Sequence, residues 1–258
     1  MKFIKFCLTG LLVGAVFFLA SCDPKLDDLG GCRVTYAGGQ NAGGTAITAV
    51  VDEGSVMTVA GNPFFRRGYR FTGWEYGGNT YQPYTSTITV MTDITLTAMW
   101  TAVPNPLYII DGNESRFTAN NNTMDTIKQT DGGGNSRSIL RQSFPGSYTY
   151  VAFMGDFISG PFDISGYTNV HISMYVPDAE SIQGWGVELA SGGNFDANEL
   201  DWKTGNINSG WNDLIFTIDS AAQEWGPADK TNINFSRIYI VRAASMASEF
   251  QIADFYVY

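Results

Sequence analysis

Apolar and polar residues alternate along most of the chain after residue 32, with the two-residue period of a half-buried β-strand. The clearest run is Ile94, Leu96, Ala98 and Trp100, and shorter runs lie at 34–36, 47–51 and 88–90. Glycine- and asparagine-rich stretches such as AGGQNAGG separate these runs and are typical of turns. The pattern therefore predicts a small domain of short strands at residues 32–101.

The same alternation predicts a larger β-domain at residues 107–258, after a Pro-containing linker at 102–106. Its strands are expected at 107–110, 138–144, 148–154, 169–176, 186–190, 214–218, 233–241 and 250–257. Gly, Asn and Asp fill the loops, and no segment has a helical period. Many short strands at this spacing predict an antiparallel β-sandwich of the jelly-roll type, so the expected fold class is all-β.

Composition supports a globular protein and excludes several functions. Hydrophobic residues make up 44% and charged residues 16% of the chain, which leaves ample material for a core. The net charge of −10 repels phosphate backbones, so no nucleic-acid partner is expected. If Cys7 is removed with a signal segment and Cys22 carries lipid, Cys32 has no cysteine partner for a disulfide, and one thiol with the single histidine cannot form a metal cluster.

The N-terminus indicates export. Two lysines precede the apolar stretch FCLTGLLVGAVFFLA, which is too short and too early for a membrane span. It ends in LASC, which resembles the lipobox of bacterial lipoproteins and implies removal of residues 1–21 and lipidation of Cys22. The alternative is an ordinary signal peptide cut near Ala20. With a lipobox, residues 22–31 form an acidic tether, and the lipid anchors the protein to the outer membrane. The aspartates of this tether resemble the surface-export signal of some Gram-negative lipoproteins, which implies a protein that faces the cell exterior.

The first domain carries a second resemblance, in VTYAGGQNAGG, GYRFTGWEYGG and ITVMTDITLTAMW. These phrases resemble one internalin-type B-repeat (Listeria–Bacteroides repeat), which implies a β-grasp-like fold and a spacer or adhesion role. A β-bulge at Thr72–Gly73 would bring Trp74 to the face that Tyr69 and Phe71 share. Trp74 and Trp100 are either a ligand platform or core; a domain this small needs their burial, which favours core. Three nearby arginines, Arg66, Arg67 and Arg70, are expected on a solvated face.

The second domain resembles the galactose-binding-like jelly rolls of carbohydrate-binding modules in GPFDISGYTNVHISMYVP, NSGWNDLIFTID and FQIADFYVY. The resemblance implies a glycan or polysaccharide partner and association with other surface glycan-processing proteins. It also implies a structural Ca²⁺ that joins the first strand, a nearby loop and the last strand. The matching residues are Asp111 or Glu114, Asp131 and Asp254, whose carboxylates suit this ion. The alternative is that they are ordinary turn aspartates.

Sugar binding needs a flat aromatic side chain with amides or carboxylates beside it. Trp225, in the polar loop AAQEWGPADK, is the first candidate, and Trp202 follows, with Asn198, Glu199 and Asp201 beside it. Trp185 is a further candidate that core packing explains equally well, and Trp211 is expected in the core.

Catalysis is not expected. Glu199-Leu-Asp201 resembles the catalytic stretch of jelly-roll glycoside hydrolases, which need two carboxylates, but the further Glu of that pattern is missing. His171, the single histidine, alternates with the apolar residues of its strand, as Ser173 and Tyr175 do. Its side chain is therefore expected to point away from the core. We therefore expect a non-catalytic, lipid-anchored surface protein that binds carbohydrate. The alternatives are an adhesin or structural module that binds host protein or matrix, and a glycoside hydrolase.

Overall fold

The structure is a computed structural model that describes residues 31–110, 117–119, 123–144, 149–157, 160–194, 196–203, 206–242 and 248–258. These residues form strands β1 to β19 and two short 3₁₀ turns, so the predicted all-β fold class is confirmed. None of the helical turns in the described ranges approaches the length or apolarity that a transmembrane helix requires. The leader, Cys22 and the predicted calcium ligands Asp111 and Glu114 lie outside the described residues.

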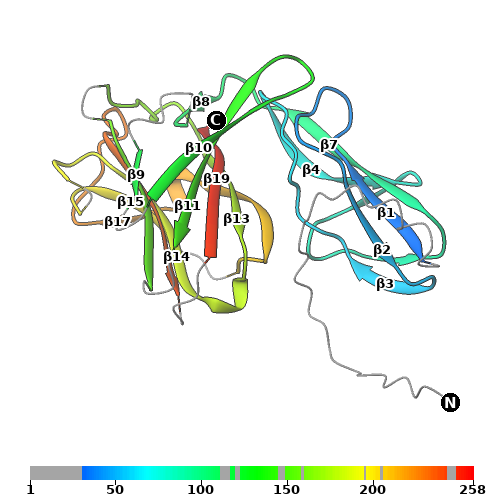
Figure 1. The fold of residues 1–258 in the computed structure, drawn as a ribbon. Coiled ribbons are helices and arrows are strands. Elements are labelled where there is room, and N and C mark those ends of the chain that lie inside the picture. The colour runs from blue at the N-terminus through cyan, green and yellow to red at the C-terminus, as the bar shows by residue number, and fades with distance from the viewer. Residues whose placement is uncertain are drawn as a thin grey trace. The chain divides into compact units, whose positions relative to one another are not determined.

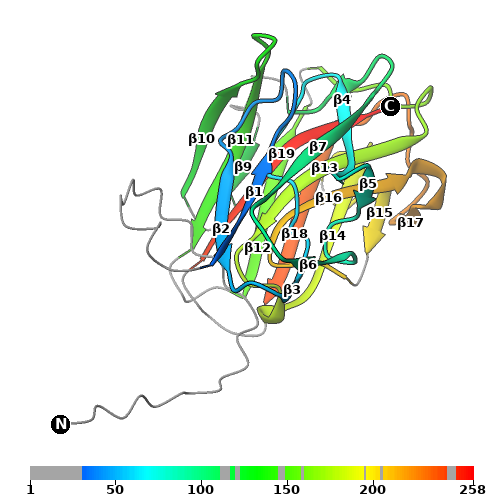
Figure 2. The same ribbon diagram turned by 90° about the vertical axis from the view of Figure 1, so that its right-hand side faces the viewer.

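Residues 32–102 form a five-stranded sheet in the order β2-β1-β7-β4-β5 (Figure 2). Its strands are β1 (Cys32–Ala37), β2 (Ile47–Val51), β4 (Tyr69–Tyr76), β5 (Asn79–Tyr81) and β7 (Ile94–Ala102). The first and last strands, β1 and β7, pair in parallel, as a β-grasp-like sheet requires. A separate hairpin-like pair joins β3 (Ser55–Thr58) to β6 (Thr87–Val90).

Trp74 is the centre of this first core. Its side chain is fully buried, its ring packs edge-on against Tyr36 and Phe71, and its indole nitrogen donates to the Ala60 carbonyl at 2.9 Å. The pairing of β4 with β7 shifts register between Phe71 and Gly73, which confirms the predicted bulge. Trp100 is half-buried against Phe71, so both tryptophans serve the core.

Residues 107–258 form a sandwich of two antiparallel sheets (Figure 1). The first sheet has the order β10-β11-β19-β13-β16, with β8 paired to β19. Its strands are β8 (Leu107–Tyr108), β10 (Thr123–Thr130), β11 (Ser136–Phe144), β13 (Asn169–Val176), β16 (Gly210–Thr217) and β19 (Ser248–Val257). The second sheet has the order β17-β15-β14-β18-β12-β9. Its strands are β9 (Phe117–Ala119), β12 (Tyr150–Asp156), β14 (Ile182–Ala190), β15 (Glu199–Lys203), β17 (Ala222–Glu224) and β18 (Phe235–Arg242).

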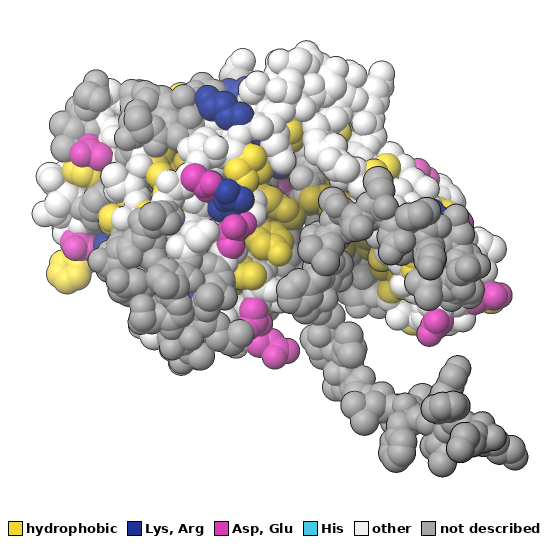
Figure 3. All heavy atoms as spheres, in the orientation of Figure 1, with side chains coloured by type: hydrophobic (Ala, Val, Ile, Leu, Met, Phe, Trp, Pro, Cys, Tyr) yellow, Lys and Arg dark blue, Asp and Glu magenta, His cyan; other side chains and the backbone are white. Residues whose placement is uncertain are grey.

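Apolar side chains from both sheets fill the space between them. From the first sheet come Ile172, Phe250 and Ile252, and from the second come Val187, Leu200 and Ile238, all nearly inaccessible. This core also contains Trp185 and Trp202, which are only 3% and 4% exposed. The outer surface of the first sheet is mixed in character: Arg141 pairs with Asp125 and Glu249, and Figure 3 shows acidic, basic and hydrophobic side chains side by side over β10, β11 and β19.

The segment 32–102 contacts the sandwich through polar groups, within one compact unit, Gly31–Tyr258. Tyr84 donates to the carbonyl of Trp211 at 2.7 Å, and the guanidinium of Arg67 donates to the Ser136 carbonyl at 3.0 Å and lies over the Tyr108 ring. Two sequence predictions are therefore corrected. Trp211 is half-buried at this contact and is absent from the sandwich core, and Arg67 contacts protein where a solvated face was expected.

Candidate functional site

The outer surface of the second sheet carries a group of charged and aromatic side chains, which we call the acidic face. In β14, β15 and β18, residues of one parity enter the core, so residues of the other parity point outward. The acidic face consists of Tyr150, Glu188, Glu199, Asp201, Lys203, Arg237 and Tyr239. Strand register brings them together, because Glu188 lies opposite Asp201 on one side and opposite Arg237 on the other.

Three carboxylates lie at the centre of this face. One oxygen each from Glu188, Glu199 and Asp201 can be chosen so that all lie within 4.8 Å of one another. All three side chains are almost inaccessible, at 5%, 1% and 2% exposure. Burying several carboxylates so close together is unfavourable unless positive charge or protons compensate for it.

Two cations partly compensate for this charge. Arg237 ion-pairs with Glu188 and donates to Asp196 at 2.9 Å. Lys203 lies 2.7 Å from Asp201 and 2.8 Å from Glu224. Glu199 is left with the Arg237 guanidinium at 3.9 Å, and no described residue donates a hydrogen bond to its buried Oε1. Glu199 is therefore the least compensated acid of the face.

The protonation equilibria follow from this arrangement. Burial, followed by the charge of Glu188, raises the pKa of Glu199 to about 7. Burial also raises the pKa values of Glu188 and Asp201, against the effects of Arg237 and Lys203. The pKa of Lys203 rises through its hydrogen bonds to Asp201 and Glu224, and burial raises the pKa of Tyr239 to about 12.

Two tyrosines give the acidic face an aromatic surface. The rings of Tyr150 and Tyr239 are stacked, with centroids 6.1 Å apart and planes inclined by 17°. Both are half-buried, so part of each ring remains accessible. Gly186 makes room for this arrangement, because a Cβ there would lie 2.5 Å from the Tyr239 hydroxyl and 2.6 Å from its ring. The glycine allows the ring to lie across β14.

The predicted sugar-binding residues lie in different environments in the structure. Trp225 is 72% exposed, as expected, and its carbonyl accepts from the Asn198 amide at 3.2 Å at the edge of the second sheet. Glu199 and Asp201 belong to the acidic face. Trp202 and Trp185 are wrong as candidates, because both indoles point between the sheets, and the Trp202 nitrogen donates to the Thr217 carbonyl.

The sequence pattern did not indicate four residues of this face: Tyr150, Tyr239, Glu188 and Arg237. A signal was present, since Arg237 and Tyr239 have the parity opposite to Ile238 and Ile240 in a predicted strand. What the pattern lacked was the pairing of β14 with β15 and β18, which places these residues side by side.

The calcium site predicted by resemblance has other contacts at its two described residues. The Asp131 carboxylate accepts from the backbone amides of Gly133, Asn135 and Arg67, and Asp254 ion-pairs with Arg137 at 2.5 Å. Because Asp111 and Glu114 lie outside the described residues, calcium at this place stays a prediction.

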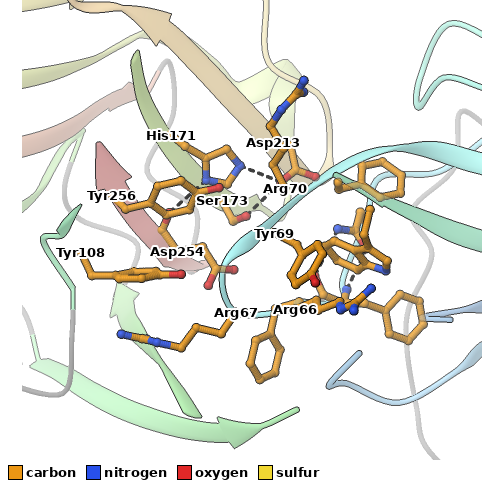
Figure 4. Close-up of a pocket in the computed structure, with 15 residues that line it drawn as sticks. Arg66, Arg67, Tyr69, Arg70, Tyr108, His171, Ser173, Asp213, Asp254 and Tyr256 are labelled. Carbon is orange, nitrogen blue, oxygen red and sulfur yellow. Dashed lines mark hydrogen bonds and ion pairs between the residues drawn. The ribbon is translucent and has the colours of Figure 1, made fainter. Parts of the chain in front are cut away.

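A small cavity lies between the first sheet of the sandwich and the segment 32–102. Its lining includes His171, Ser173, Asp213, Asp254 and Tyr256 (Figure 4). Its volume is about 10 Å³, room for about one water molecule. His171 bonds through Nε2 to Asp213 at 3.2 Å and through Nδ1 to the Asp254 carbonyl at 3.0 Å. His171 thus points away from the sandwich core, as predicted, yet is only 3% exposed.

A larger cleft of about 420 Å³ opens near the start of β14. It is lined by Tyr84, Gln183 and Gly184, with Asn206 and Asn208 contributing amides. Gly184 lies on the same strand as Glu188, but no residue of the acidic face lines the cleft.

No family model matches the chain, and no characterised protein matches it by sequence. Among solved structures, it is similar to a family 11 carbohydrate-binding module from Clostridium thermocellum in complex with a β-1,3-1,4-mixed-linked tetrasaccharide (12% identity, 59% of this chain, 94% of that chain, TM-score 0.42). It is also similar to a CBM27-1 module from Caldicellulosiruptor saccharolyticus in complex with mannohexaose (14% identity, 61% and 97%, TM-score 0.37). An exo-β-agarase matches with the same TM-score of 0.42 over 57% of this chain and 24% of its own. At these identities the matches assign no ligand to the acidic face.

Proposed function

We propose that this protein binds carbohydrate without catalysis, and that the acidic face of the second sheet is the binding surface. The observation that carries the proposal is the stacked Tyr150–Tyr239 pair beside a row of carboxylates and two cations. Aromatic rings offer an apolar surface to the C–H groups of a pyranose. Lys203, Glu224 and Asp196, next to the three buried acids, keep accessible charged groups, which form strong, directional hydrogen bonds with hydroxyls.

The charge of the face narrows the ligand class. Five acids, Glu188, Asp196, Glu199, Asp201 and Glu224, surround the two cations Arg237 and Lys203. Such a surface repels sulfated or uronic-acid polymers and accepts neutral, hydroxyl-rich glycans. Neutral polysaccharides are therefore the proposed ligand, and the exposed Trp225 at the sheet edge is available as a further stacking residue.

A glycan array with the purified protein, followed by calorimetric titration of the best ligand, tests the proposal. We expect a dissociation constant between about 1 μM and 1 mM, which corresponds to about −8 to −4 kcal/mol. Tyr239→Ala should weaken binding by about tenfold, because a loss of about 1.4 kcal/mol follows from removing one stacking ring.

Ile215→Ala is the matched control, since Ile215 is an exposed side chain on the first sheet. It should bind as tightly as the unaltered protein. No binding to any neutral polysaccharide, or equal loss in both variants, would contradict the proposed surface. Adhesion to protein or matrix without glycan binding would favour the adhesin alternative.

Hydrolysis is the second candidate because the structure supplies a carboxylate that the linear pattern lacked. Glu188 lies opposite Asp201 on the neighbouring strand, so three acids meet where a glycosidase needs two. Their near-complete burial weighs against this activity, since a substrate must reach both acids. Release of reducing sugar that disappears in Glu199→Gln would support a glycosidase.

The proposed setting is a lipid anchor at Cys22 that holds the sandwich at the outer membrane, facing the cell exterior, beside glycan-processing proteins. The LASC sequence supports it. Metabolic labelling with a fatty-acid analogue should mark the native chain and not Cys22→Ser.

A further inference from the structure

We infer that Glu188, Glu199 and Asp201 form a site for one divalent cation, and that calcium is the ion that fits it. The site lies on β14 and β15 of the acidic face and is distinct from the calcium position that the sequence resemblance implies. The inference does not rest on carbohydrate binding and can be tested without any glycan.

The geometry of the three acids suits an ion of calcium's size. Calcium accepts oxygen ligands at about 2.3–2.6 Å, so two ligands on opposite sides of one ion are about 4.8 Å apart. One oxygen from each of the three carboxylates falls within that limit in the structure. Magnesium demands a strict octahedron at about 2.0–2.1 Å, keeps several of its waters and is usually bound by only one or two carboxylates, so a cluster of three protein carboxylates favours calcium.

An independent observation shows that positive charge does not fully compensate the buried carboxylates of this site. Glu199 is 1% exposed, and no described residue donates a hydrogen bond to its Oε1. Buried carboxylates ordinarily have partners, because water removed from them must be replaced. The Oδ1 atom of Asp201 is likewise buried without a hydrogen-bond donor among the described residues. Both side chains extend from the same face of β15 toward Glu188.

The neighbouring cations do not meet this need. Arg237 is engaged by Glu188 and Asp196 and reaches Glu199 only at 3.9 Å. Lys203 is shared between Asp201 and Glu224 and is itself more than half exposed. Asp196 and Glu224, the outer partners of these cations, add two further negative charges around the three central acids. An excess of negative charge therefore surrounds the three carboxylates, and it attracts a dication from solution.

Thermal unfolding of the purified protein with EDTA and with calcium tests the site. Calcium up to about 10 mM should raise the melting temperature by about 5 °C, because a ligand that binds only the folded state stabilises it, and calcium sites of surface modules saturate in this range. Terbium, a luminescent substitute for calcium, should emit when Tyr239 or Tyr150 is excited, and calcium should displace it.

The variant Glu199→Gln distinguishes a carboxylate that binds a cation from one that only contributes to the stability of the fold. This variant should be at least as stable as the unaltered protein in EDTA, because it removes like-charge repulsion, and it should lose the calcium response and the terbium signal. Asp201→Asn should weaken calcium binding by at least tenfold. It tests the same cation site independently if Glu199→Gln is unstable.

Asp125→Asn, an exposed carboxylate on the first sheet, is the matched control and should keep the full response. A protein indifferent to calcium and terbium, as expected if Glu199 is simply protonated, would overturn the inference. So would a response that persists in both Glu199→Gln and Asp201→Asn, because calcium would then bind elsewhere.

Discussion

Two tryptophans of the sandwich show how local environment decides the role of a side chain. The Trp202 indole is 4% exposed, packs against Phe216 and donates its N–H to the Thr217 carbonyl at 3.0 Å. Trp225 follows β17 with a positive φ of 55° and leaves its ring 72% exposed. The first therefore belongs to the stability of the fold, and the second is available to a ligand.

Replacing each tryptophan by alanine should separate these roles. Trp202→Ala should lower the free energy of unfolding by about 3–5 kcal/mol, because it leaves a cavity between the sheets. Trp225→Ala should change that free energy by less than about 0.5 kcal/mol, since its ring is in solvent. Urea denaturation followed by circular dichroism measures both. A tolerated Trp202→Ala would show that the core assignment of this indole is wrong.

At the scale of the element, a single glycine shapes β4. Gly73 has φ +138°, and a Cβ there would lie 2.9 Å from the Gln82 amide nitrogen and 3.1 Å from the Tyr81 carbonyl oxygen. The bulge at this residue turns Trp74 into the core formed with Tyr36 and Phe71. The strand can therefore bury residues of both parities on one face.

Gly73→Ala should destabilise the protein by about 1–3 kcal/mol, because the side chain must adopt a strained φ and meets the backbone of β5. Denaturant unfolding measures the change. Gly166→Ala is the control, since nothing lies within 4 Å of a Cβ there, and it should stay within about 0.5 kcal/mol of the unaltered protein. Equal effects would show that the bulge imposes no strain.

Alternation in the sequence was sufficient to predict elements with one clearly apolar face. The strand predicted at 169–176 matches β13 to the residue, because Val170, Ile172, Met174 and Val176 all enter the core. Strand β10 (Thr123–Thr130) was missed. Its only large apolar side chains are Met124 and Ile127, and they are of opposite parity, so pairing with β11 positions it.

The candidate site was predictable only in part. Glu199 and Asp201 share a face by local parity, which the sequence contains. Their proximity to Glu188 and Arg237 depends on the register of β14 with β15 and β18, and Arg237 is 49 residues from Glu188 along the chain. Register between distant strands has no local pattern, so the sequence alone could not assemble the acidic face.

At the scale of the whole described unit, contact with another part of the chain changes the environment of His171. Its parity on β13 points it away from the sandwich core, but Tyr256 stacks on the ring at 4.6 Å, and Asp213 and the Asp254 carbonyl bond its nitrogens. The same cavity is lined by Arg66, Arg67 and Arg70 (Figure 4). The imidazole therefore lies among acidic, phenolic and guanidinium groups at a contact between the two β-structures.

This environment makes the stability of the protein depend on pH. Burial disfavours the charged ring, but the hydrogen bond and charge of Asp213, with a further contribution from Asp254, outweigh burial and raise the pKa of His171 above 6.5. The stabilisation is fully present below the unfolded pKa of about 6.5 and is lost as pH rises through the folded pKa.

Because the chain has one histidine, a single imidazole resonance reports the pKa of His171 by NMR. Asp213→Asn should lower it and flatten the decline in unfolding free energy as pH rises above about 6.5, whereas Asp219→Asn, at an exposed acid, should not. A His171 pKa at or below 6.5 would contradict the assignment.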